Sequence, residues 1–399
     1  MQQFIFIAFL FASESLFAQA FFSEKKDFAT GECPISVSLG DFNGDGKPDI
    51  VVANYKSGTV SFFLNTTSPG AITPSFSAKT DFISGEHPMS VSVGDFNGDG
   101  KPDIAVGNYI SNTVSVFLNT TTPGATTLSF STKMDLTSGE RPISVSAGDL
   151  NADGKIDLAV ANYKFSTVSV FLNTTGRGDT TPSFSPKMDF PTGEHPVSVS
   201  LGDFNGDDKP DLAVANYRSN TVSIFLNTTA PDAKIPSFST KIDFTTGERP
   251  ASVAVGDFNG DGKPDLAVAN YGSHTISIFL NTTIPGAAAP SFSTRTDIAT
   301  GMNPQYVCIG DFNGDGKPDI AVANYNSATI SVYVNTTTPG DTTASFSTKK
   351  DFTTGIAPSS ISTSDLNGDG KPDLTLTNYG SNTVSVLLNK TASGNLHVK

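Results

Sequence analysis

The sequence has no tryptophan, two cysteines and four histidines in 399 residues. So few cysteines cannot staple a disulfide-rich domain, and the spacing of cysteines and histidines matches no zinc site. We expect Cys33 and Cys308 to stay unpaired, because they occupy different positions of the repeat described below and lie in units that are not neighbours.

Basic residues are also scarce, since 25 Lys and Arg stand against 39 Asp and Glu, and the formal net charge is −14. No stretch of the chain gathers Lys and Arg into a stripe that could meet phosphates, which argues against a nucleic-acid partner. No basic cluster adjoins an apolar segment, so attraction to anionic lipid is not expected either.

Long apolar runs are missing after the N-terminus. The run "FIFIAFLFA" at 4–12 is too short to span a bilayer, and Ala18–Gln19–Ala20 fits a small-residue cleavage site. We therefore predict a signal peptide at 1–20, although the opening "MQQ" has no basic residue. The mature chain, 21–399, is expected to be a secreted, soluble, monomeric single domain without a membrane span.

No segment of the mature chain shows a helical period. A nine-residue string recurs instead, every 54 residues, and it first reads "DFNGDGKPD" at 41–49. A fixed period of this length indicates a repeat architecture. The copies begin at Asp41, Asp95, Asp149, Asp203, Asp257, Asp311 and Asp365.

Each unit reads as four strands separated by turn residues. In the first unit, alternation at 34–42, an apolar run at 49–55 and β-branched and aromatic residues at 59–67 predict three strands. A Pro/Gly/Thr loop then leads to the most polar strand, 75–82. Seven units of this kind predict an all-β fold, a seven-bladed β-propeller of four-stranded antiparallel blades around a central channel.

A basic residue recurs at the centre of the polar strand, where a charge would discourage edge-to-edge pairing. It is Lys79, Lys133, Lys187, Lys241, Arg295 or Lys349.

The ends of the chain predict how the ring closes. The last unit stops after its third strand, and residues 21–28 are in register with the fourth-strand sequence 54 residues later. We therefore expect the N-terminal strand to complete the last blade. The alternative, an open solenoid, would need polar capping repeats, and the sequence shows none.

The recurring string has the spacing D-x-N-x-D-G-x-x-D, with oxygen-bearing groups at positions 1, 3, 5, 7 and 9. Ca²⁺ takes about six to eight oxygen ligands, so three carboxylates, an amide and a backbone carbonyl would supply most of its shell. Gly46 at position 6 would allow the positive φ of a reversal, and Phe42 at position 2 should point into the blade.

The predicted ligands of structural Ca²⁺, with each Lys contributing its backbone carbonyl, are Asp41, Asn43, Asp45, Lys47, Asp49, Asp95, Asn97, Asp99, Lys101, Asp103, Asp149, Asn151, Asp153, Lys155, Asp157, Asp203, Asn205, Asp207, Lys209, Asp211, Asp257, Asn259, Asp261, Lys263, Asp265, Asp311, Asn313, Asp315, Lys317, Asp319, Asp365, Asn367, Asp369, Lys371 and Asp373.

Related metal-binding loops and plain turns fit the string less well. An EF-hand needs Glu at position 12, where the first loop has Val52, and the RTX nonapeptide pattern is absent. Mg²⁺ dehydrates too reluctantly for an all-protein cage. Asp, Asn and Gly alone make good turns, but seven copies with one spacing favour metal. Seven Ca²⁺ would add +14 to a chain of formal charge −14.

Two loops deviate from the pattern. Ala152 and Ile156 replace Gly and Pro in the third loop, and Asp208 replaces the Gly at position 6 of the fourth. Because Asp tolerates the left-handed region better than most residues, the fourth loop is expected to bind metal, but more weakly.

With these loops and this period, the sequence resembles the FG-GAP/VCBS repeat family over essentially the whole mature chain. The family includes the seven-bladed propeller of integrin α-subunits and some fungal propeller lectins. The resemblance implies structural Ca²⁺ in the loop between the first two strands of each blade. It also implies a ligand face on the opposite side of the ring.

The loops expected on that opposite face differ between repeats. After a recurring Asn-Tyr they carry Lys56, Ile110, Lys164, Arg218, Gly272, Asn326 or Gly380. Before a recurring Pro they carry Cys33, His87, Arg141, His195, Arg249, Asn303 or Ala357. Free drift of exposed loop tips and a mosaic binding surface would both account for this variation.

Two further features recur without change. The tyrosines Tyr55, Tyr109, Tyr163, Tyr217, Tyr271, Tyr325 and Tyr379 could stack on sugars, or pack between blades with satisfied hydroxyls. The N-x-T sequons at Asn65, Asn119, Asn173, Asn227, Asn281, Asn335 and Asn389 are either glycosylation acceptors or strand-ending turns.

Three functions remain to be weighed. The first is an extracellular binding or adhesion module for a protein, and the second is a multivalent carbohydrate-binding lectin. The third, an enzyme of polysaccharide metabolism, is not expected, because near-identical blades offer no single nucleophile, acid–base pair or open metal site. A glycan array run with calcium would separate the first two.

Overall fold

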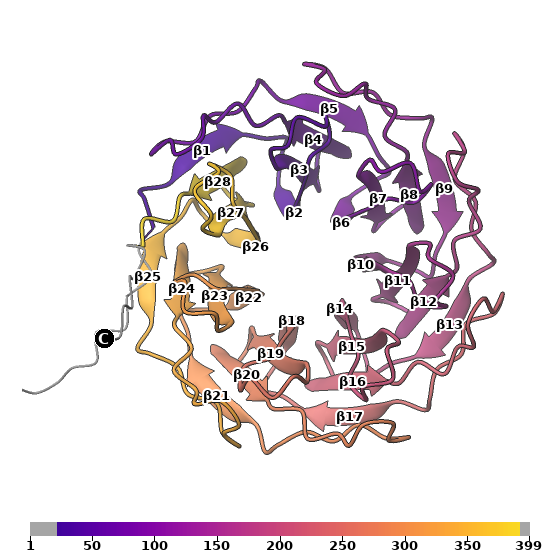
Figure 1. Ribbon diagram of the computed structural model, residues 1–399, viewed down its shortest axis with the longest axis vertical. Helices are drawn as coiled ribbons and strands as arrows, with labels where there is room; N and C mark the ends of the chain where they lie inside the picture. Colours follow the sequence, from indigo (N-terminus) through magenta and orange to yellow (C-terminus); the bar gives the residue numbers. More distant parts are fainter. Residues whose placement is uncertain (1–21, 392–399) are drawn as a thin grey trace, which may run out of the picture.

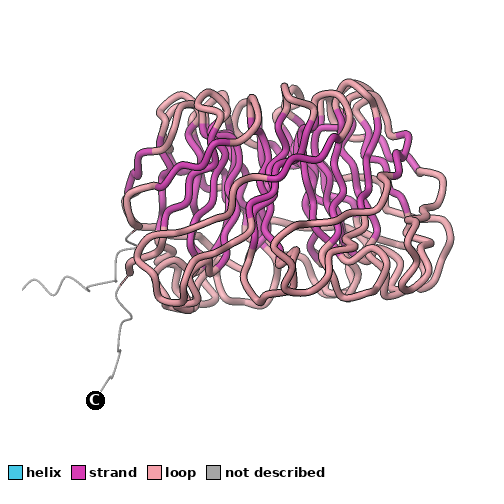
Figure 2. Tube along the Cα trace, turned by 90° about the horizontal axis from the view of Figure 1, so that it is seen from above, coloured by secondary structure: helices cyan, strands magenta, loops and turns pink. Residues whose placement is uncertain are grey.

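The computed structural model describes residues 22–391, and within them it contains 28 β-strands and no helix. The strands form seven four-stranded antiparallel sheets. The sheets stand around a central opening (Figure 1), and a view at right angles shows the strands running between two layers of loops (Figure 2). The predicted seven-bladed propeller is confirmed.

Each blade has an inner, a second, a third and an outer strand, counted outwards from the channel, and blades 1 to 7 follow the order of the inner strands. The inner strands are β2 (Pro34–Gly40), β6 (Pro88–Gly94), β10 (Pro142–Gly148), β14 (Pro196–Gly202), β18 (Pro250–Gly256), β22 (Pro304–Gly310) and β26 (Pro358–Ser364). The second strands are β3 (Asp49–Asn54), β7 (Asp103–Asn108), β11 (Asp157–Asn162), β15 (Asp211–Asn216), β19 (Asp265–Asn270), β23 (Asp319–Asn324) and β27 (Asp373–Asn378).

The third strands are β4 (Thr59–Phe63), β8 (Thr113–Phe117), β12 (Thr167–Phe171), β16 (Thr221–Phe225), β20 (Thr275–Phe279), β24 (Thr329–Tyr333) and β28 (Thr383–Leu387). The outer strands are β5 (Thr80–Ile83), β9 (Met134–Thr137), β13 (Met188–Pro191), β17 (Ile242–Thr245), β21 (Thr296–Ala299), β25 (Lys350–Thr353) and, in blade 7, β1 (Lys26–Ala29).

The beginning of the chain closes the last blade. β1 pairs antiparallel with β28, with Lys26 opposite Val386 and Ala29 opposite Thr383. An additional bridge joins Phe22 to Asn389. The predicted closure is therefore confirmed, and every blade has its four strands.

The outer strand is shorter than predicted. In blade 1 it covers Thr80–Ile83 rather than 75–82, because the Leu64 N–H is taken by the Ser77 hydroxyl instead of a backbone carbonyl. Lys79 thus lies just before the strand, where its ammonium pairs with the Asp81 carboxylate. The expectation of a charge at the centre of this strand was wrong. The third strand likewise ends at Phe63.

The hydrophobic core lies between blades. The first cluster joins Phe42 and Phe62 of blade 1 to Val91 and Ile104 of blade 2, and Phe42 is 1% exposed, as predicted for position 2. The second strand β3 is buried along its whole length, as its apolar run indicated. Because each cluster draws on two adjacent blades, neighbouring blades stabilise one another.

Three further expectations concern the signal peptide, membrane spans and the two cysteines. The signal peptide at 1–20 lies outside the described residues and stays a prediction. Within residues 22–391, no helix has the length and apolar character needed to cross a membrane. Cys33 and Cys308 are both free, as expected.

Candidate calcium loops and the opposite loop face

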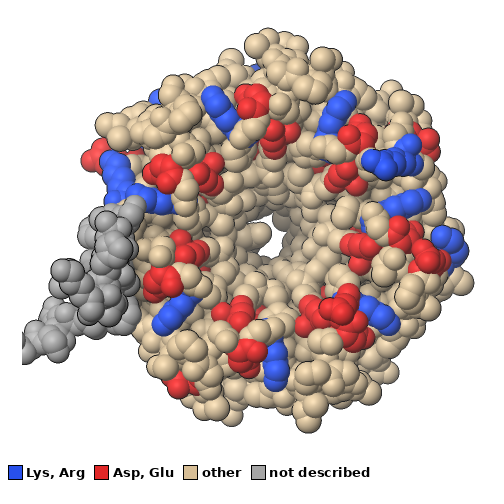
Figure 3. All heavy atoms as spheres, viewed as in Figure 1, with Lys and Arg blue, Asp and Glu red and all other residues tan. Residues whose placement is uncertain are grey.

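The nine-residue strings, called aspartate loops from here on, join the inner and second strands of each blade on one face of the ring. The turns between third and outer strands share this face, since the Gly124 amide donates to the Asn43 carbonyl of the preceding blade at 2.6 Å. We call it the aspartate face. Figure 3 shows acidic side chains over each blade, around the open mouth of the channel.

In the first loop, the side chains of positions 1, 3 and 5 gather around one stretch of backbone. Asp41 Oδ1 and Asn43 Oδ1 accept the Asp45 N–H at 3.0 and 3.3 Å, and Asp41 Oδ2 accepts the Gly46 N–H at 2.8 Å. Gly46 has φ +84°, which is the predicted reversal. Each of these oxygens keeps a second lone pair. Oxygens from neighbouring side chains are therefore available to coordinate a cation within one small volume.

The carboxylate at position 9 is placed differently. Asp49 is fully buried, its Oδ2 accepts the Phe42 N–H at 2.9 Å, and its Oδ1 accepts the Asn65 N–H at 2.7 Å. It therefore ties the start of the loop to the end of the third strand. The same pair of bonds recurs at Asp103, Asp157, Asp211, Asp265, Asp319 and Asp373.

Burial makes these position-9 carboxylates unusually basic. Desolvation raises the pKa of Asp49 to about 7, and the nearby charges of Asp45 and Asp41 also raise it, while the two backbone N–H bonds oppose the shift. The pKa of Asp373 rises for the same reasons to about 6. A cation bound in the loop would counter both the desolvation and the repulsion.

The residues of the loops fit the all-oxygen chemistry of Ca²⁺. In the fourth loop, Asn205 Oδ1 is buried without a hydrogen-bond partner, and a bound cation would satisfy it. Among residues 22–391, no three His, Cys, Asp or Glu side chains form a metal site by themselves. A metal would therefore also need the Asn and backbone oxygens that the sequence predicted.

The two deviating loops keep the backbone of the others. Ala152 and Asp208 take positive φ values of 54° and 64°, in place of the glycines found in other copies. Asp207 N still donates to Asp203 Oδ1 at 3.0 Å. The third loop also keeps the bond from the Asp153 N–H to Asn151 Oδ1, which the fourth loop lacks, and the strain of a non-glycine residue falls on the loop itself.

The next blade clamps most aspartate loops from outside. Asn43 Nδ2 donates to the Ala125 carbonyl at 3.3 Å, alongside the Gly124 bond described above. In blade 7 the third and outer strands are β28 and β1, the last and first strands of the described residues, so no turn within residues 22–391 joins them. The sixth loop therefore lacks this clamp within the described residues, and Asn313 Nδ2 turns to Asp315 instead.

Sequence reasoning missed what the sequon asparagines do. Asn119 is 1% exposed, and its Nδ2 donates to the Phe42 carbonyl of the preceding blade at 2.9 Å and to the Pro102 carbonyl of its own blade at 3.1 Å. Thr121, the last sequon residue, accepts the Ser129 N–H at 3.0 Å and donates to the Ser129 carbonyl at 3.2 Å. Both sequon side chains are engaged inside the ring, which supports the structural interpretation of the repeat.

The other face, called the tyrosine face, carries a ring of recurring tyrosines. Neighbouring rings are 6.4 Å apart between Tyr109 and Tyr163, and 6.3 Å apart between Tyr217 and Tyr271. Tyr163 and Tyr217 also line the channel cavity. None of the hydroxyls of this ring is among the buried polar atoms that lack a partner within the described residues.

The variable residue before the recurring Pro covers a tyrosine of the preceding blade. His195 stacks on Tyr163 at 4.2 Å between ring centroids, and the guanidinium of Arg249 lies 5.9 Å from the centroid of Tyr217. The rings thus pack between blades, as predicted, while the covering group changes from blade to blade.

Charge on the tyrosine face is confined to part of the ring. Glu32 pairs with Lys56 at 3.1 Å, and blades 3 and 4 have equivalent pairs. In blades 6 and 7, Met302 and Ile356 occupy the position that Glu32 has in blade 1, and they are 55% and 66% exposed. The face therefore has a charged sector and an apolar sector.

Two grooves on this face have similar charged residues but different apolar residues. One, of about 410 Å³, lies between blades 4 and 5 and is lined by His195, Tyr217, Arg218, Asn220, Glu248 and Arg249. The other, of about 810 Å³, includes Glu86, His87 and Ile110 between blades 1 and 2. Each groove has one glutamate and two basic side chains, which are Lys56 and Lys133 in the second, but only the second is lined by isoleucines, Ile83 and Ile110.

These features define a repeat β-propeller with oxygen-rich loops on one face. Matches to the FG-GAP-like repeat cover residues 41–106, 95–160, 149–214, 203–268, 257–322 and 311–376, and an FG-GAP repeat match covers 357–398. The chain belongs to the FG-GAP repeat family.

Solved structures with the same fold include two described as the crystal structure of BBS1N in complex with ARL6DN, one soaked with lead and one with mercury. They are 12% and 11% identical to this chain, each with a TM-score of 0.58, and cover 94% of this chain and 98% of the other. Among curated proteins, none matches the chain.

Proposed function

We propose that this chain is an exported calcium-binding propeller whose tyrosine face binds an extracellular protein. The observation that carries the proposal is the division of the ring. The aspartate face repeats its side chains and most of their bonds, whereas the tyrosine face keeps its backbone and changes its side chains. A surface that varies on a fixed scaffold is where recognition is usually found.

Calcium has a structural role in this proposal. Each loop would hold Ca²⁺ through positions 1, 3 and 5, the carbonyl of position 7 and the carboxylate of position 9, and the positive charge would relieve the repulsion among the carboxylates. The partnerless Asn205 Oδ1 supports this assignment. Nothing in such a closed, all-protein shell favours catalysis, so we propose binding rather than an enzymatic reaction.

A protein partner is favoured over a multivalent lectin by the grooves between blades. Seven equivalent sugar sites would need the same residues in each groove, but Ile83 and Ile110 line the groove between blades 1 and 2, whereas the groove between blades 4 and 5 has no isoleucine. The exposed Met302 and Ile356 beside charged blades give the mixture of apolar and polar surface typical of protein interfaces. The BBS1N neighbour, crystallised with ARL6DN, is a propeller of the same fold in a protein complex.

Calcium binding is tested by thermal unfolding with and without a chelator. Because a ligand held only by the folded state stabilises it by about 2.7 kcal/mol at a hundredfold excess over its Kd, several sites together should raise the Tm by many degrees. Isothermal titration should count several Ca²⁺ per chain. A Tm that the chelator leaves unchanged would reject structural calcium.

The binding face is tested with two pairs of substitutions, by cross-linking to proteins of the extracellular medium. Met302→Asp with Ile356→Asp alters the apolar sector of the tyrosine face. Ile72→Asp with Ile284→Asp alters residues of the aspartate face that are 78% and 75% exposed, and is the matched control. We expect the first pair alone to abolish a specific cross-link. Loss with the control pair alone would place binding on the aspartate face and reject the proposal.

A further inference from the structure

The inner strand of blade 6 breaks the repeat inside the channel. Six blades have a serine at the third position of the inner strand, and blade 6 has Tyr306 there. Its neighbours Gln305 and Cys308 also replace the residues found in blades 1 to 4. The difference lies within a cavity of about 470 Å³ in the channel, which is an ordinary size for a small-ligand site.

The serines form a ladder that links blades across the channel wall. Ser36 Oγ accepts the Val91 N–H of the next blade at 3.2 Å, and Ser90 and Ser144 repeat this bond at 3.1 and 3.2 Å. Since each hydroxyl acts there as an acceptor, its own proton remains free to be donated. An arc of donors is thereby directed at the channel by blades 1 to 3.

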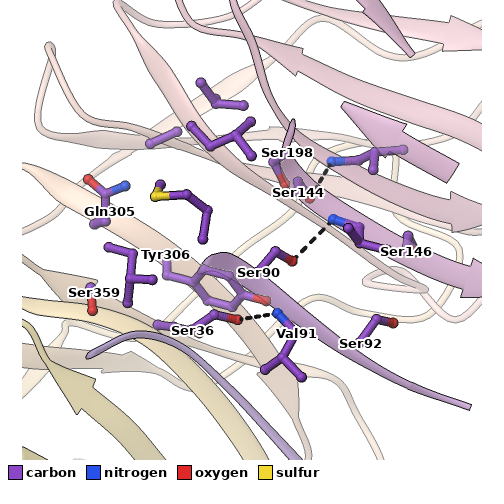
Figure 4. Close-up of a pocket in the computed structure, with 18 of the residues that line it drawn as sticks. Ser36, Ser90, Val91, Ser92, Ser144, Ser146, Ser198, Gln305, Tyr306 and Ser359 are labelled. Carbon is purple, nitrogen blue, oxygen red and sulfur yellow. Dashed lines mark hydrogen bonds between the residues drawn. The ribbon is translucent and has the colours of Figure 1, made fainter. Parts of the chain in front are cut away.

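Tyr306 makes the channel one-sided. Its ring points into the cavity among the serines (Figure 4), and 36% of its surface stays exposed. Ser252 and Ser360, on the blades that flank it, are only 2% exposed, whereas Ser36 and its neighbours on blades 1 to 3 are half-buried. An aromatic face therefore stands on one side of the lumen and hydroxyl donors on the other.

The lining carries no charge among the described residues. It consists of serines, apolar side chains such as Ile35, Met89 and Ile143, one glutamine and tyrosines. The protein atoms around the channel desolvate the Tyr306 hydroxyl and raise its pKa to about 12, so it stays neutral at neutral pH. A charged ligand would lose its hydration here without gaining a counter-charge.

We propose that this cavity binds one neutral saccharide, with a sugar ring stacked on Tyr306 and its hydroxyls accepting from the arc of Ser36, Ser90 and Ser144. A sugar ring has an apolar C–H face and a rim of hydroxyls, which matches an aromatic face opposite hydroxyl donors. Tyr163 and Tyr217, at the tyrosine face, line the way in. The site is separate from the protein-binding surface proposed above.

The test starts from an array of neutral, sialylated and sulfated oligosaccharides, followed by isothermal titration of the strongest neutral binder. We expect a stoichiometry of one per chain. Tyr306→Ser installs the residue that six blades already have, so the variant should fold, and it should weaken binding by about tenfold or more. Tyr306→Phe keeps the ring and should stay within a fewfold of the parent.

Tyr325→Ser, at the mouth but outside the cavity lining, is the control and should bind like the parent. Melting curves of all variants check that the ring is intact. Several sugars per chain, unchanged affinity in Tyr306→Ser, preference for charged glycans, or silence across the array would each overturn the inference. None of these results bears on the cross-linking experiment for the protein partner.

Discussion

The aspartate face and the tyrosine face use the same backbone repeat in opposite ways. On the aspartate face the buried Asp at position 9 makes the same two bonds in every blade. On the tyrosine face, the residue before the recurring Pro keeps φ between 53° and 62° in all seven blades, although it is Cys, His, Arg, Asn or Ala. The backbone there is fixed by its neighbours, so side chains can change without disturbing the ring.

The largest expected effect acts on all seven aspartate loops at once. In the metal-free protein the position-9 carboxylates have pKa values of about 7, or about 6 for Asp373, against an ordinary 3.8. The folded state thus binds protons more tightly than the unfolded state, and stability is lost as the pH rises through 7. With chelator present, the Tm should therefore increase as the pH is lowered from about 8 to about 6.

Calcium should remove most of that pH dependence, because the cation already neutralises the carboxylates. Calorimetry in chelator and in excess calcium, at the same two pH values, measures both slopes. A metal-free protein that melts lower at the more acidic pH would contradict this account of the loops.

Removal of one position-9 carboxylate should have the next largest effect. Asp103→Ala leaves the Phe96 and Asn119 N–H groups buried without acceptors, which costs about 2–6 kcal/mol at about 1–3 kcal/mol each. Urea unfolding measures the loss. Asp99→Ala, in the exposed part of the same loop, is the control. In chelator it should cost much less than Asp103→Ala, and equal losses would refute the distinction between the two carboxylates.

The bonds between blades come next. Asn119→Ala removes the two bonds that Asn119 donates to the Phe42 and Pro102 carbonyls, and it should lower the free energy of unfolding by about 1–3 kcal/mol, as measured by urea unfolding.

Folded protein secreted from a eukaryotic host should also carry no N-glycan on the seven sequons, because their asparagines are buried. Intact mass before and after glycosidase treatment tests for N-glycans. A mass shift in protein of full stability would contradict the prediction that the sequons are unmodified.

The smallest effect belongs to the tyrosine face. Lys56→Ala breaks an ion pair whose side chains are 64% and 60% exposed, and should change the free energy of unfolding by less than about 1 kcal/mol. The same urea experiment serves here. A loss as large as that of Asn119→Ala would mean that this face also supports the ring, which would remove the contrast between the faces.

The sequence predicted most of the fold because the information repeats within it. The 54-residue period gave the number of blades, and the register of residues 21–28 gave the closure. Phe42 and Gly46 took the predicted places. The limits of the outer strand were missed, since the Ser77 hydroxyl replaces a ladder bond there and no strand pattern reports that.

The missed contacts join residues of different blades. Asn119 reaches Phe42 across 77 positions, and Ser36 reaches Val91 across 55, so their partners depend on how closely blades approach in the closed ring. Tyr306 was visible as a departure from the serine of other repeats. Its position in the channel, however, required knowing which residues of the inner strand face the lumen.

The closure of the ring also delays the completion of folding until β28 has been made, because the two strands that close it lie far apart in the sequence. Of the described strands, β1 is made first and its partner β28 last, and the Asp27 carboxylate accepts a hydrogen bond from the Ser385 hydroxyl, 358 residues downstream. At about 5–20 residues per second, synthesis of that distance takes roughly 20–70 s. Throughout that interval the first strand lacks its native partner, and a chain truncated before Thr383 never completes its seventh blade.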